Sequence, residues 1–561
     1  MPRFLASLLI AAAVAAPAVP VAATGLSGAY LAATQADIRD DYAEAARYYD
    51  RVLALDPTNV GILTNALVAR VALGDFAAAR PLADRLEEVD PNNQVATLVR
   101  LGDMLAASQF AEAKAVLDKT ADTLNPLLAA LLAGWIEVGL EEFDAARATF
   151  DATTGGDALV AYGQYHKALA LAFAGDFVGA EAIMAGGEEG PLHLNRSSIV
   201  AHAEILAQLG READAVRVID EALAGNVPDE PLLALRQRLA AGEEVPFDVV
   251  TRARDGAAEA FLTLADALNT SDSQRVALLH ARIAAHIRPE LIEANLLAAE
   301  LLEDEGQHAL ATAALATVPE SSPWYVTAQI RRAATQRAAG DPEAGIATLA
   351  ELAGHYPDRI EVQSGLGDAL RMAERYPEAV AAYDAAVALV AEPSPVHWPL
   401  FYTRGIANER AGNWPAAERD FREALRLEPN QPLVLNYLGY SLVEKHEKLD
   451  EALGMIERAA KAEPEDGYIT DSLGWVLYRL GRYQDAVKPM LRAVELTPDD
   501  PVINDHLGDV LWMVGRKREA EFQWRRALSF GPAEDLDMDR IRRKLEVGLD
   551  QVLADEPRQD G

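Results

Sequence analysis

Small and bulky apolar residues recur along the C-terminal half of the chain in a pattern that returns every 34 or 35 residues. Each period holds an alanine, a large apolar residue four positions later and a closing proline. The alanines are Ala417, Ala452, Ala486 and Ala520. The large residues are Phe421, Ile456, Met490 and Trp524. The prolines are Pro429, Pro464, Pro498 and Pro532. The spacing predicts two helices per period.

The residue types fit two antiparallel helices. Such helices can cross closely only where both carry small residues. Glycine or alanine therefore belongs at the crossing on the first helix and alanine on the second, with the large residue beside them. The proline ends the second helix because it lacks an amide hydrogen and disfavours helix in the preceding residue. This period and order are the tetratricopeptide-repeat (TPR) signature. The sequence predicts an all-α TPR superhelical solenoid of about 13–15 repeats with a C-terminal capping helix.

The same register extends back through most of the chain. Units of a weaker series begin near residues 26, 60, 94, 127, 161 and 196, and those of a clearer series at 258, 292, 326, 360, 398, 432, 467 and 501. Gly242 and Pro246 interrupt the pattern between the two series. The expected organisation is a degenerate N-terminal array at 24–228, an irregular joint at 229–257, a C-terminal array at 258–533, a capping helix at 534–554 and a disordered tail at 555–561.

The first residues predict export. Arg3 precedes an apolar run at 4–16, and the small-residue stretch 21–23 has the form of a signal-peptide cleavage site. The run is too short for a good membrane span. Because the chain has no cysteine, it cannot carry a bacterial lipoprotein anchor. We therefore expect cleavage of 1–23 and a soluble periplasmic protein without a stable membrane anchor.

Composition narrows the possible partners and chemistry. Asp and Glu number 87 against 51 Lys and Arg, a formal charge of −36, which argues against nucleic acid. The charge has two interpretations, a solvated outer surface or a face that selects a basic partner. No catalytic or cofactor-binding motif is present, and the ten histidines do not cluster. An acidic series from Asp535 has the spacing of a calcium loop, but Arg540 stands where glycine is required. We expect no enzyme, cofactor or metal.

Residues of the first helix that are not used in packing should line the concave groove of the array. In the C-terminal units these positions are rich in aromatic and polar residues, a composition typical of binding hot spots. The predicted partner-binding groove residues are Tyr402, Asn436, Tyr440, Tyr468, Asp471, Trp475, Tyr478, Arg479, Asp505, Asp509 and Trp512. For Trp475, Tyr478 and Trp512 the alternative is a structural role in the core.

The stretch 398–531, with the motif GWVLYRLGR at 474–482, resembles bacterial envelope TPR proteins of the LbcA type. The resemblance implies an adaptor that binds a periplasmic carboxyl-terminal processing protease and delivers client hydrolases to it. Those adaptors are lipidated, which this chain cannot be. We therefore expect a non-catalytic periplasmic scaffold that binds proteins in its groove, most plausibly such an adaptor. The alternative is a structural scaffold of an envelope assembly, in secretion, polysaccharide export or outer-membrane biogenesis.

Overall fold

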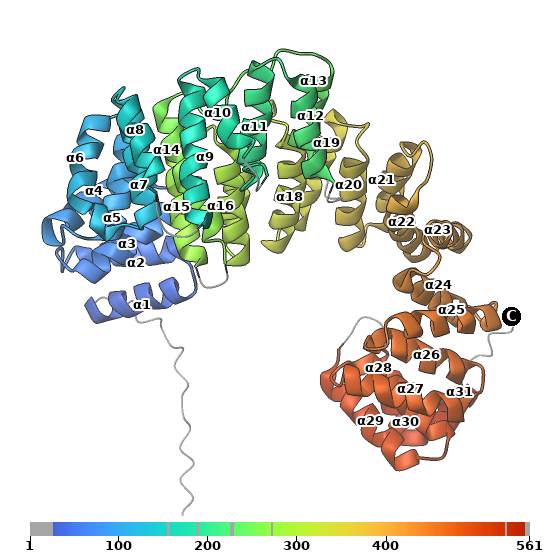
Figure 1. Ribbon diagram of the computed structural model, residues 1–561. Helices are drawn as coiled ribbons and strands as arrows, with labels where there is room; N and C mark the ends of the chain where they lie inside the picture. The colour runs from blue at the N-terminus through green and yellow to red at the C-terminus, as the bar shows by residue number, and fades with distance from the viewer. Residues whose placement is uncertain are drawn as a thin grey trace, which may run out of the picture. The chain divides into compact units, whose positions relative to one another are not determined.

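In a computed structural model the residues that the structure describes, 26–153, 157–186, 190–224, 229–270, 273–532 and 536–555, form helices joined by turns and loops. The expected signal peptide and residues 556–561 of the expected tail lie outside these ranges. The helices alternate in antiparallel pairs joined by short turns (Figure 1). Two compact units divide the chain, one up to Thr348 and one from Leu349 onward.

The first unit contains six regular pairs, a single helix and then further pairs. Its helices are α1 (Leu26–Ile38), α2 (Tyr42–Leu53), α3 (Val60–Ala72), α4 (Phe76–Val89), α5 (Gln94–Ala106), α6 (Phe110–Thr120), η1 (Ala121–Thr123), α7 (Pro126–Gly139), α8 (Phe143–Asp151), α9 (Asp157–Phe173), α10 (Phe177–Met184), α11 (Arg196–Gln208), α12 (Glu212–Leu223), α13 (Glu230–Ala240), α14 (Ala253–Ala267), α15 (Gln274–Ile287), α16 (Ile292–Asp304), α17 (His308–Leu315) and α18 (Tyr325–Ala338).

Local sequence sets the helix ends in this unit. Asp75 accepts a hydrogen bond from the backbone N–H of Ala78 at 3.1 Å, and Asn93 accepts one from Ala96 at 3.2 Å. Such side chains satisfy amides that have no partner inside the helix. Gly74, between α3 and α4, has a φ of 73°, in the left-handed region that glycine adopts at low cost. The pairs thus follow the predicted register.

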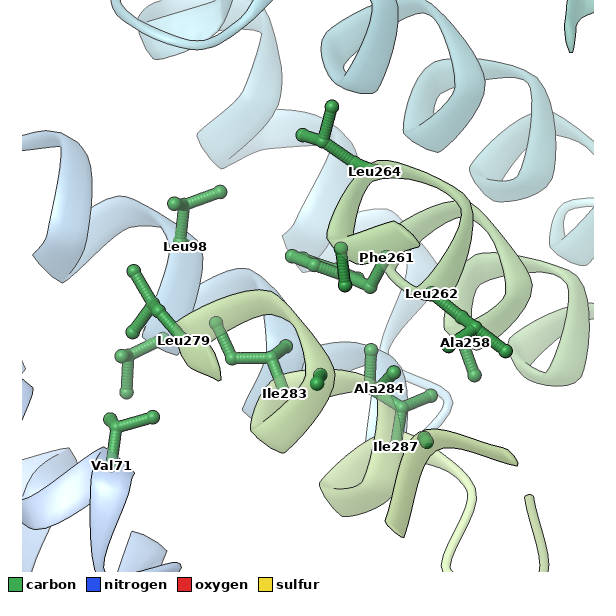
Figure 2. Packing of buried hydrophobic residues seen from close by; sticks show 14 of the residues in the cluster. Val71, Leu98, Ala258, Phe261, Leu262, Leu264, Leu279, Ile283, Ala284 and Ile287 are labelled. Atoms are coloured by element: carbon green, nitrogen blue, oxygen red, sulfur yellow. The ribbon is translucent and has the colours of Figure 1, made fainter. Parts of the chain in front are cut away.

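Helices α14 and α15 contact earlier helix pairs as well as their neighbours in the chain. They pack against the first helices of earlier pairs, with α14 on α7 and α15 on α5 and α3 (Figure 1). Figure 2 shows the apolar contact, in which Ile283 and Leu279 of α15 and Phe261 of α14 lie among buried residues such as Val71 and Leu98. The expected joint at 229–257 therefore lies inside the first unit, where it contributes α13 and the start of α14.

The second unit is a regular array of pairs followed by two short helices. α19 (Pro342–His355) crosses the boundary between the units. The remaining helices are α20 (Ile360–Met372), α21 (Tyr376–Ala388), η2 (Pro395–His397), α22 (Trp398–Arg410), α23 (Trp414–Leu427), α24 (Pro432–Glu444), α25 (Leu449–Ala462), α26 (Gly467–Arg479), α27 (Tyr483–Leu496), α28 (Pro501–Met513), α29 (Lys517–Phe530), α30 (Met538–Val547) and α31 (Leu549–Asp555).

The small residues of the repeat lie where the helices of a pair cross, as predicted. A Cβ at Gly508 of α28 would lie 2.4 Å from the ring of Trp524 on α29, and a Cβ at Gly405 would lie 2.6 Å from the ring of Phe421. Ala486 is completely buried. The large residue of each period thus fills the space that the small residue leaves.

The array ends in two helices where one was expected. Gly548 separates α30 from α31 and has a φ of 84°. A side chain at this position would also meet the ring of Trp512, at 2.6 Å from a Cβ. The chain therefore turns at Gly548, and both short helices cover the last pair of the array, with Ile541 and Leu549 buried in its core.

Candidate partner-binding groove

The first helices of successive pairs in the second unit form a common surface. α24 contacts α26, and α26 contacts α28, in addition to their partners within each pair. A groove of about 670 Å³ runs along this surface from the end of α22 to the start of α28. Four of the predicted groove residues line it, namely Asn436, Tyr440, Tyr468 and Asp471.

The structure adds lining residues that the sequence did not single out. They include Glu409, Tyr437, Glu444, Asp500 and His506. Several of them lie next to predicted positions in the same helices. A groove prediction that used more positions of the first helix would have included them. The groove therefore combines tyrosine rings with acidic side chains, a surface suited to a protein segment.

Asp471 lies at the base of this groove and is already paired within the chain. Its carboxylate is 2.9 Å from Nδ1 of His506, and both side chains are buried. Burial disfavours the charged imidazole, but the attraction of Asp471 and its hydrogen bond outweigh burial, so the pKa of His506 is raised. The pair fixes α26 to α28 rather than leaving Asp471 to a partner.

Trp475 does not line the groove but contacts two residues that do, His506 and Glu444. Its ring is stacked between Tyr478, at a centroid distance of 4.8 Å, and His506, at 3.9 Å, and its indole N–H donates to Glu444 at 2.7 Å. Only 9% of its surface is exposed. Arg479 also donates to Glu444, at 3.1 Å, and lies over the Trp475 ring. These residues support the shape of the groove, and the aromatic stack resembles a small core more than a contact surface.

Three predicted residues on α28 are covered by the C-terminal helices. The Nζ of Lys544, on α30, is 2.8 Å from both carboxylate oxygens of Asp505 and 2.6 Å from Asp509. The indole N–H of Trp512 donates to Asp550 of α31 at 3.0 Å. These side chains hold the end of the array in place.

Tyr402 belongs to an aromatic cluster at the other end. Its ring lies 5.9 Å from that of Tyr437, edge to face, and 6.1 Å from that of Phe421. Tyr402 does not line the groove of α24 and α26. Burial raises its pKa, which is the effect of an apolar surrounding on a phenol.

In the first unit, α14 covers the first helix α7, and α15 covers the first helices α5 and α3. Trp135 of α7 is completely buried and donates through its indole nitrogen to Nδ1 of His166 at 2.9 Å. The other nitrogen of His166 lies 3.4 Å from Thr263 of α14. Burial lowers the pKa of His166 to about 3, so the ring is neutral and its Nδ1 can accept a hydrogen bond from the indole N–H. The cluster joins α7, α9 and α14.

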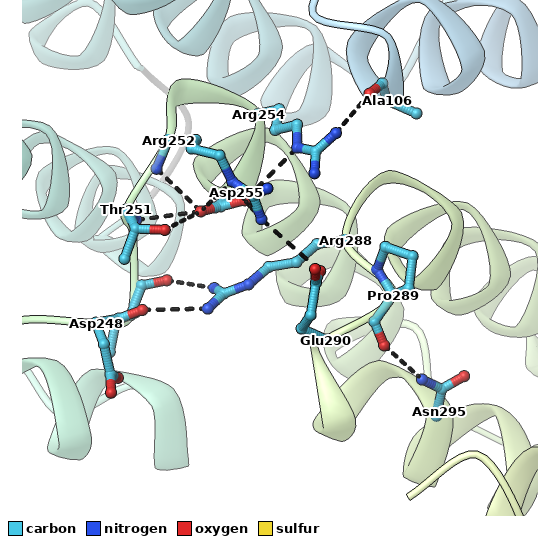
Figure 3. Close-up of polar contacts among 11 residues, drawn as sticks. Ala106, Asp248, Thr251, Arg252, Arg254, Asp255, Arg288, Pro289, Glu290 and Asn295 are labelled. Atoms are coloured by element: carbon cyan, nitrogen blue, oxygen red, sulfur yellow. Dashed lines mark hydrogen bonds and ion pairs between the residues drawn. The ribbon is translucent and has the colours of Figure 1, made fainter. Parts of the chain in front are cut away.

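Polar contacts also hold the start of α14 against the rest of the first unit (Figure 3). Asp255 accepts hydrogen bonds from the backbone N–H groups of Thr251 and Arg252, at 3.1 and 2.9 Å. Arg254 reaches across to the carbonyl oxygen of Ala106, at the end of α5, at 2.7 Å. Arg288 donates to the carbonyl of Val249 at 2.5 Å. The hairpin of α14 and α15 is therefore fixed by polar as well as apolar contacts.

Other kinds of site find no support in the described part of the chain. Within it, no group of three or more His, Cys, Asp or Glu side chains is placed to hold a metal ion. None of the helices in those ranges combines the length and the apolar character needed to cross a membrane.

Comparisons with known proteins agree with the repeat pattern. Two tetratricopeptide-repeat family models match, one at 330–393, 402–446 and 442–501 and the other at 39–101. The chain is 38% identical over 87 residues to the TPR repeat-containing protein PA4667 of Pseudomonas aeruginosa. That stretch is 16% of this chain and spans only 15% of the relative's length.

Solved structures of repeat proteins show weak similarity. A chain of the APC/C hetero-tetramer Cut9–Hcn1 matches at 15% identity and a TM-score of 0.38, over 94% of this chain and 97% of that one. A tetratricopeptide repeat protein from Parabacteroides merdae matches at 16% identity and a TM-score of 0.37, over 46% of this chain and 97% of that one.

The paired helices, with small residues at their crossings, define a helical repeat solenoid. The matches specify the kind of repeat, and the chain carries tetratricopeptide repeats at 39–101 and over most of 330–501. TPR proteins bind other proteins, and the fold is typically that of a non-catalytic scaffold.

Proposed function

We propose that this protein is a non-catalytic scaffold that is exported to the periplasm and binds a segment of a partner protein in the groove of its second unit. The observation that carries the proposal is the contrast between the two units. The first helices α3, α5 and α7 of the first unit are covered by α14 and α15, whereas the groove along α24 and α26 is lined by tyrosines and polar side chains and is open. Aromatic side chains in a polar surrounding supply much of the binding energy in protein interfaces.

The particular role that we propose is an adaptor for a periplasmic carboxyl-terminal processing protease and its client hydrolase. Its support is the resemblance of 398–531 to envelope adaptors of the LbcA type. The alternative is a structural scaffold of an envelope assembly. The two differ in the proteins that they capture, a protease and a hydrolase in one case and export or assembly components in the other.

The test is capture of partners from a periplasmic extract by the immobilised mature chain, with identification by mass spectrometry. Tyr468 lines the groove and is 60% exposed, and Phe522 of α29 lies outside the groove lining and is 58% exposed. We expect Tyr468→Ala to weaken capture of the partner by roughly 5- to 150-fold, corresponding to about 1 to 3 kcal/mol for a hot-spot residue.

Phe522→Ala removes a similar exposed aromatic area outside the groove and should leave capture unchanged. Equal capture by wild type and Tyr468→Ala would refute binding in this groove. Export is tested separately, because the native protein should begin near Thr24 after cleavage, and an intact Met1 in a cytoplasmic fraction would refute it.

A further inference from the structure

Helix α1, at the N-terminal end of the first unit, leaves an apolar face exposed. The helix packs on α2 through a line of buried alanines, spaced four and three residues apart, at Ala29, Ala33 and Ala36. The opposite face carries large apolar side chains. Leu31 is 65% exposed and Ile38 is 69% exposed, and these two lie seven residues, or two helical turns, apart on one line. The half-exposed ring of Tyr30 lies beside them.

This exposed face of α1 is also uncharged. The helix contains a single charged residue, Asp37, and that side chain pairs with Arg275 of α15. The other end of the chain is different, because α30 presents exposed Asp539 and Arg542 side chains. The end of a repeat array needs a polar outer face to stay soluble. Because α1 lacks one, its apolar face has the character of an interaction surface.

The position of α1 in the array indicates what covers this face. The following first helices are packed between two neighbours, α3 between α2 and α4 and α5 between α4 and α6. Among the described helices, α1 has an extensive contact with α2 alone, and it is the outermost helix at this end of the first unit (Figure 1). Each of these neighbours is itself a helix. A helix with an apolar face is therefore the element that fits against α1.

The charge of the chain favours a second copy of α1 as that helix. The formal charge of −36 makes two copies repel each other wherever their acidic surfaces meet. The exposed face of α1 brings no carboxylate into such a contact. A two-fold axis places the same face of both copies against each other, so an apolar face is complementary to itself. The second copy thereby supplies the neighbour that α1 lacks.

We propose that two copies of the mature chain associate through their α1 helices, antiparallel across a two-fold axis, with Leu31 and Ile38 of each copy packed on those of the other. Thr34 lies midway between these two residues and so lies close to the axis. One helix face is smaller than the roughly 800 Å² per partner of a standard interface, so the dimer is weak, with a dissociation constant in the micromolar range. The inference is independent of the groove in the second unit.

The first test is sedimentation equilibrium of the chain that begins at Thr24, at concentrations from about 1 to about 200 μM. We expect a reversible equilibrium of monomer and dimer. Leu31→Glu should weaken the dimer at least about tenfold, because it would bury two unpaired carboxylates in the contact. The matched control is Val178→Glu on α10, where an apolar side chain is 70% exposed away from α1, and it should leave the dimer unchanged. Salt should strengthen association, because it screens the repulsion between copies.

The second test uses the absence of cysteine from the chain. Thr34→Cys places a single thiol on the exposed face of α1, and Val178→Cys places one on α10 as the matched control. A disulfide forms only where the two Cα atoms come within about 7 Å. Under mild oxidation we expect at least about tenfold more disulfide-linked dimer from Thr34→Cys than from the control, and Leu31→Glu in the same chain should remove the difference.

Several results would overturn the proposal. They are a chain that stays monomeric over the whole concentration range, a Leu31→Glu variant that dimerises like wild type, and equal cross-linking of the two cysteine variants. Assemblies that keep growing with concentration would indicate a contact between two different surfaces, and they would overturn the two-fold pairing. Circular dichroism melting verifies that each variant is folded, and the cross-linking comparison does not depend on the glutamate variants.

Discussion

The packing of α14 into the first unit leads to a prediction about a single glycine. Gly256 of α14 faces the buried ring of Trp135 on α7, and an added Cβ would lie 2.2 Å from two of the ring carbons. Carbon atoms in contact lie about 3.5 to 4 Å apart. In Gly256→Ala the ring or the helix must therefore move by roughly 1.3 Å or more. The space around Trp135 is closed, since the ring is completely buried.

The magnitude follows from three contributions. Overpacking in a well-packed core costs about 1 to 3 kcal/mol. Displacement of the ring weakens the hydrogen bond from Trp135 to His166, which is worth about 1 kcal/mol. Replacing glycine by alanine inside a helix gains about 1 kcal/mol. The net expectation is a loss of about 1 to 3 kcal/mol in the stability of the contact between α7 and α14.

The assay is amide hydrogen exchange followed by mass spectrometry of peptides from 126–139 and 253–267. A loss of this size accelerates exchange by roughly 5- to 150-fold where exchange requires separation of these helices. The matched control is Gly454→Ala, inside α25, where an added Cβ would meet nothing within 4 Å. Gly454→Ala should slow amide exchange in α25 or leave it unchanged, because only the helix propensity of that position changes.

Two results would refute this reasoning. Unchanged or slower exchange at 253–267 in Gly256→Ala would mean that α14 does not pack on Trp135. A loss of the same size at the control position would mean that the cost comes from the backbone and not from the contact.

Two further predictions concern a buried acid and a buried ring. Burial, with a further contribution from Glu293, raises the pKa of Glu259 to about 7. The folded state therefore keeps a proton that the unfolded state loses, so stability should fall by about 3 kcal/mol as pH rises from about 4.5 to about 7 and then level off. Urea unfolding at a series of pH values should show a loss of stability over this range that is smaller by about 3 kcal/mol in Glu259→Gln than in wild type. Trp475→Ala should cost about 3 to 5 kcal/mol of stability because the ring is buried, whereas exposed Tyr468→Ala should change stability by less than about 0.5 kcal/mol. Equal melting temperatures of the two variants would contradict the buried position of Trp475.

Parts of the groove were predictable because they follow the repeat. Asn436, Tyr440, Tyr468 and Asp471 occupy positions that recur every 34 or 35 residues on the first helix, and the structure places all four in the groove lining. Whether a partner binds there stays a prediction. The fate of Asp505 and its neighbours on α28 was not predictable from the register, because it depends on a lysine 39 residues further along the chain.

The sequence by itself determined the helix pairs and the residues at their crossings. In a solenoid each helix packs mainly on its neighbours, so the same contacts return with every repeat and leave a period in the sequence. Ala486 and Gly508 lie at crossings for that reason.

Only the tertiary structure decided which inner surfaces are filled. The contact of Gly256 with Trp135 and that of Lys544 with Asp505 each join segments that occur once, so they leave no period. α14 is buried on nearly every face, a property of helices in the centre of a protein, but sequence alone does not specify which surface covers it. The geometry of the folded chain therefore decides that α14 and α15 cover α3, α5 and α7 in the first unit and that the groove of α24 stays open.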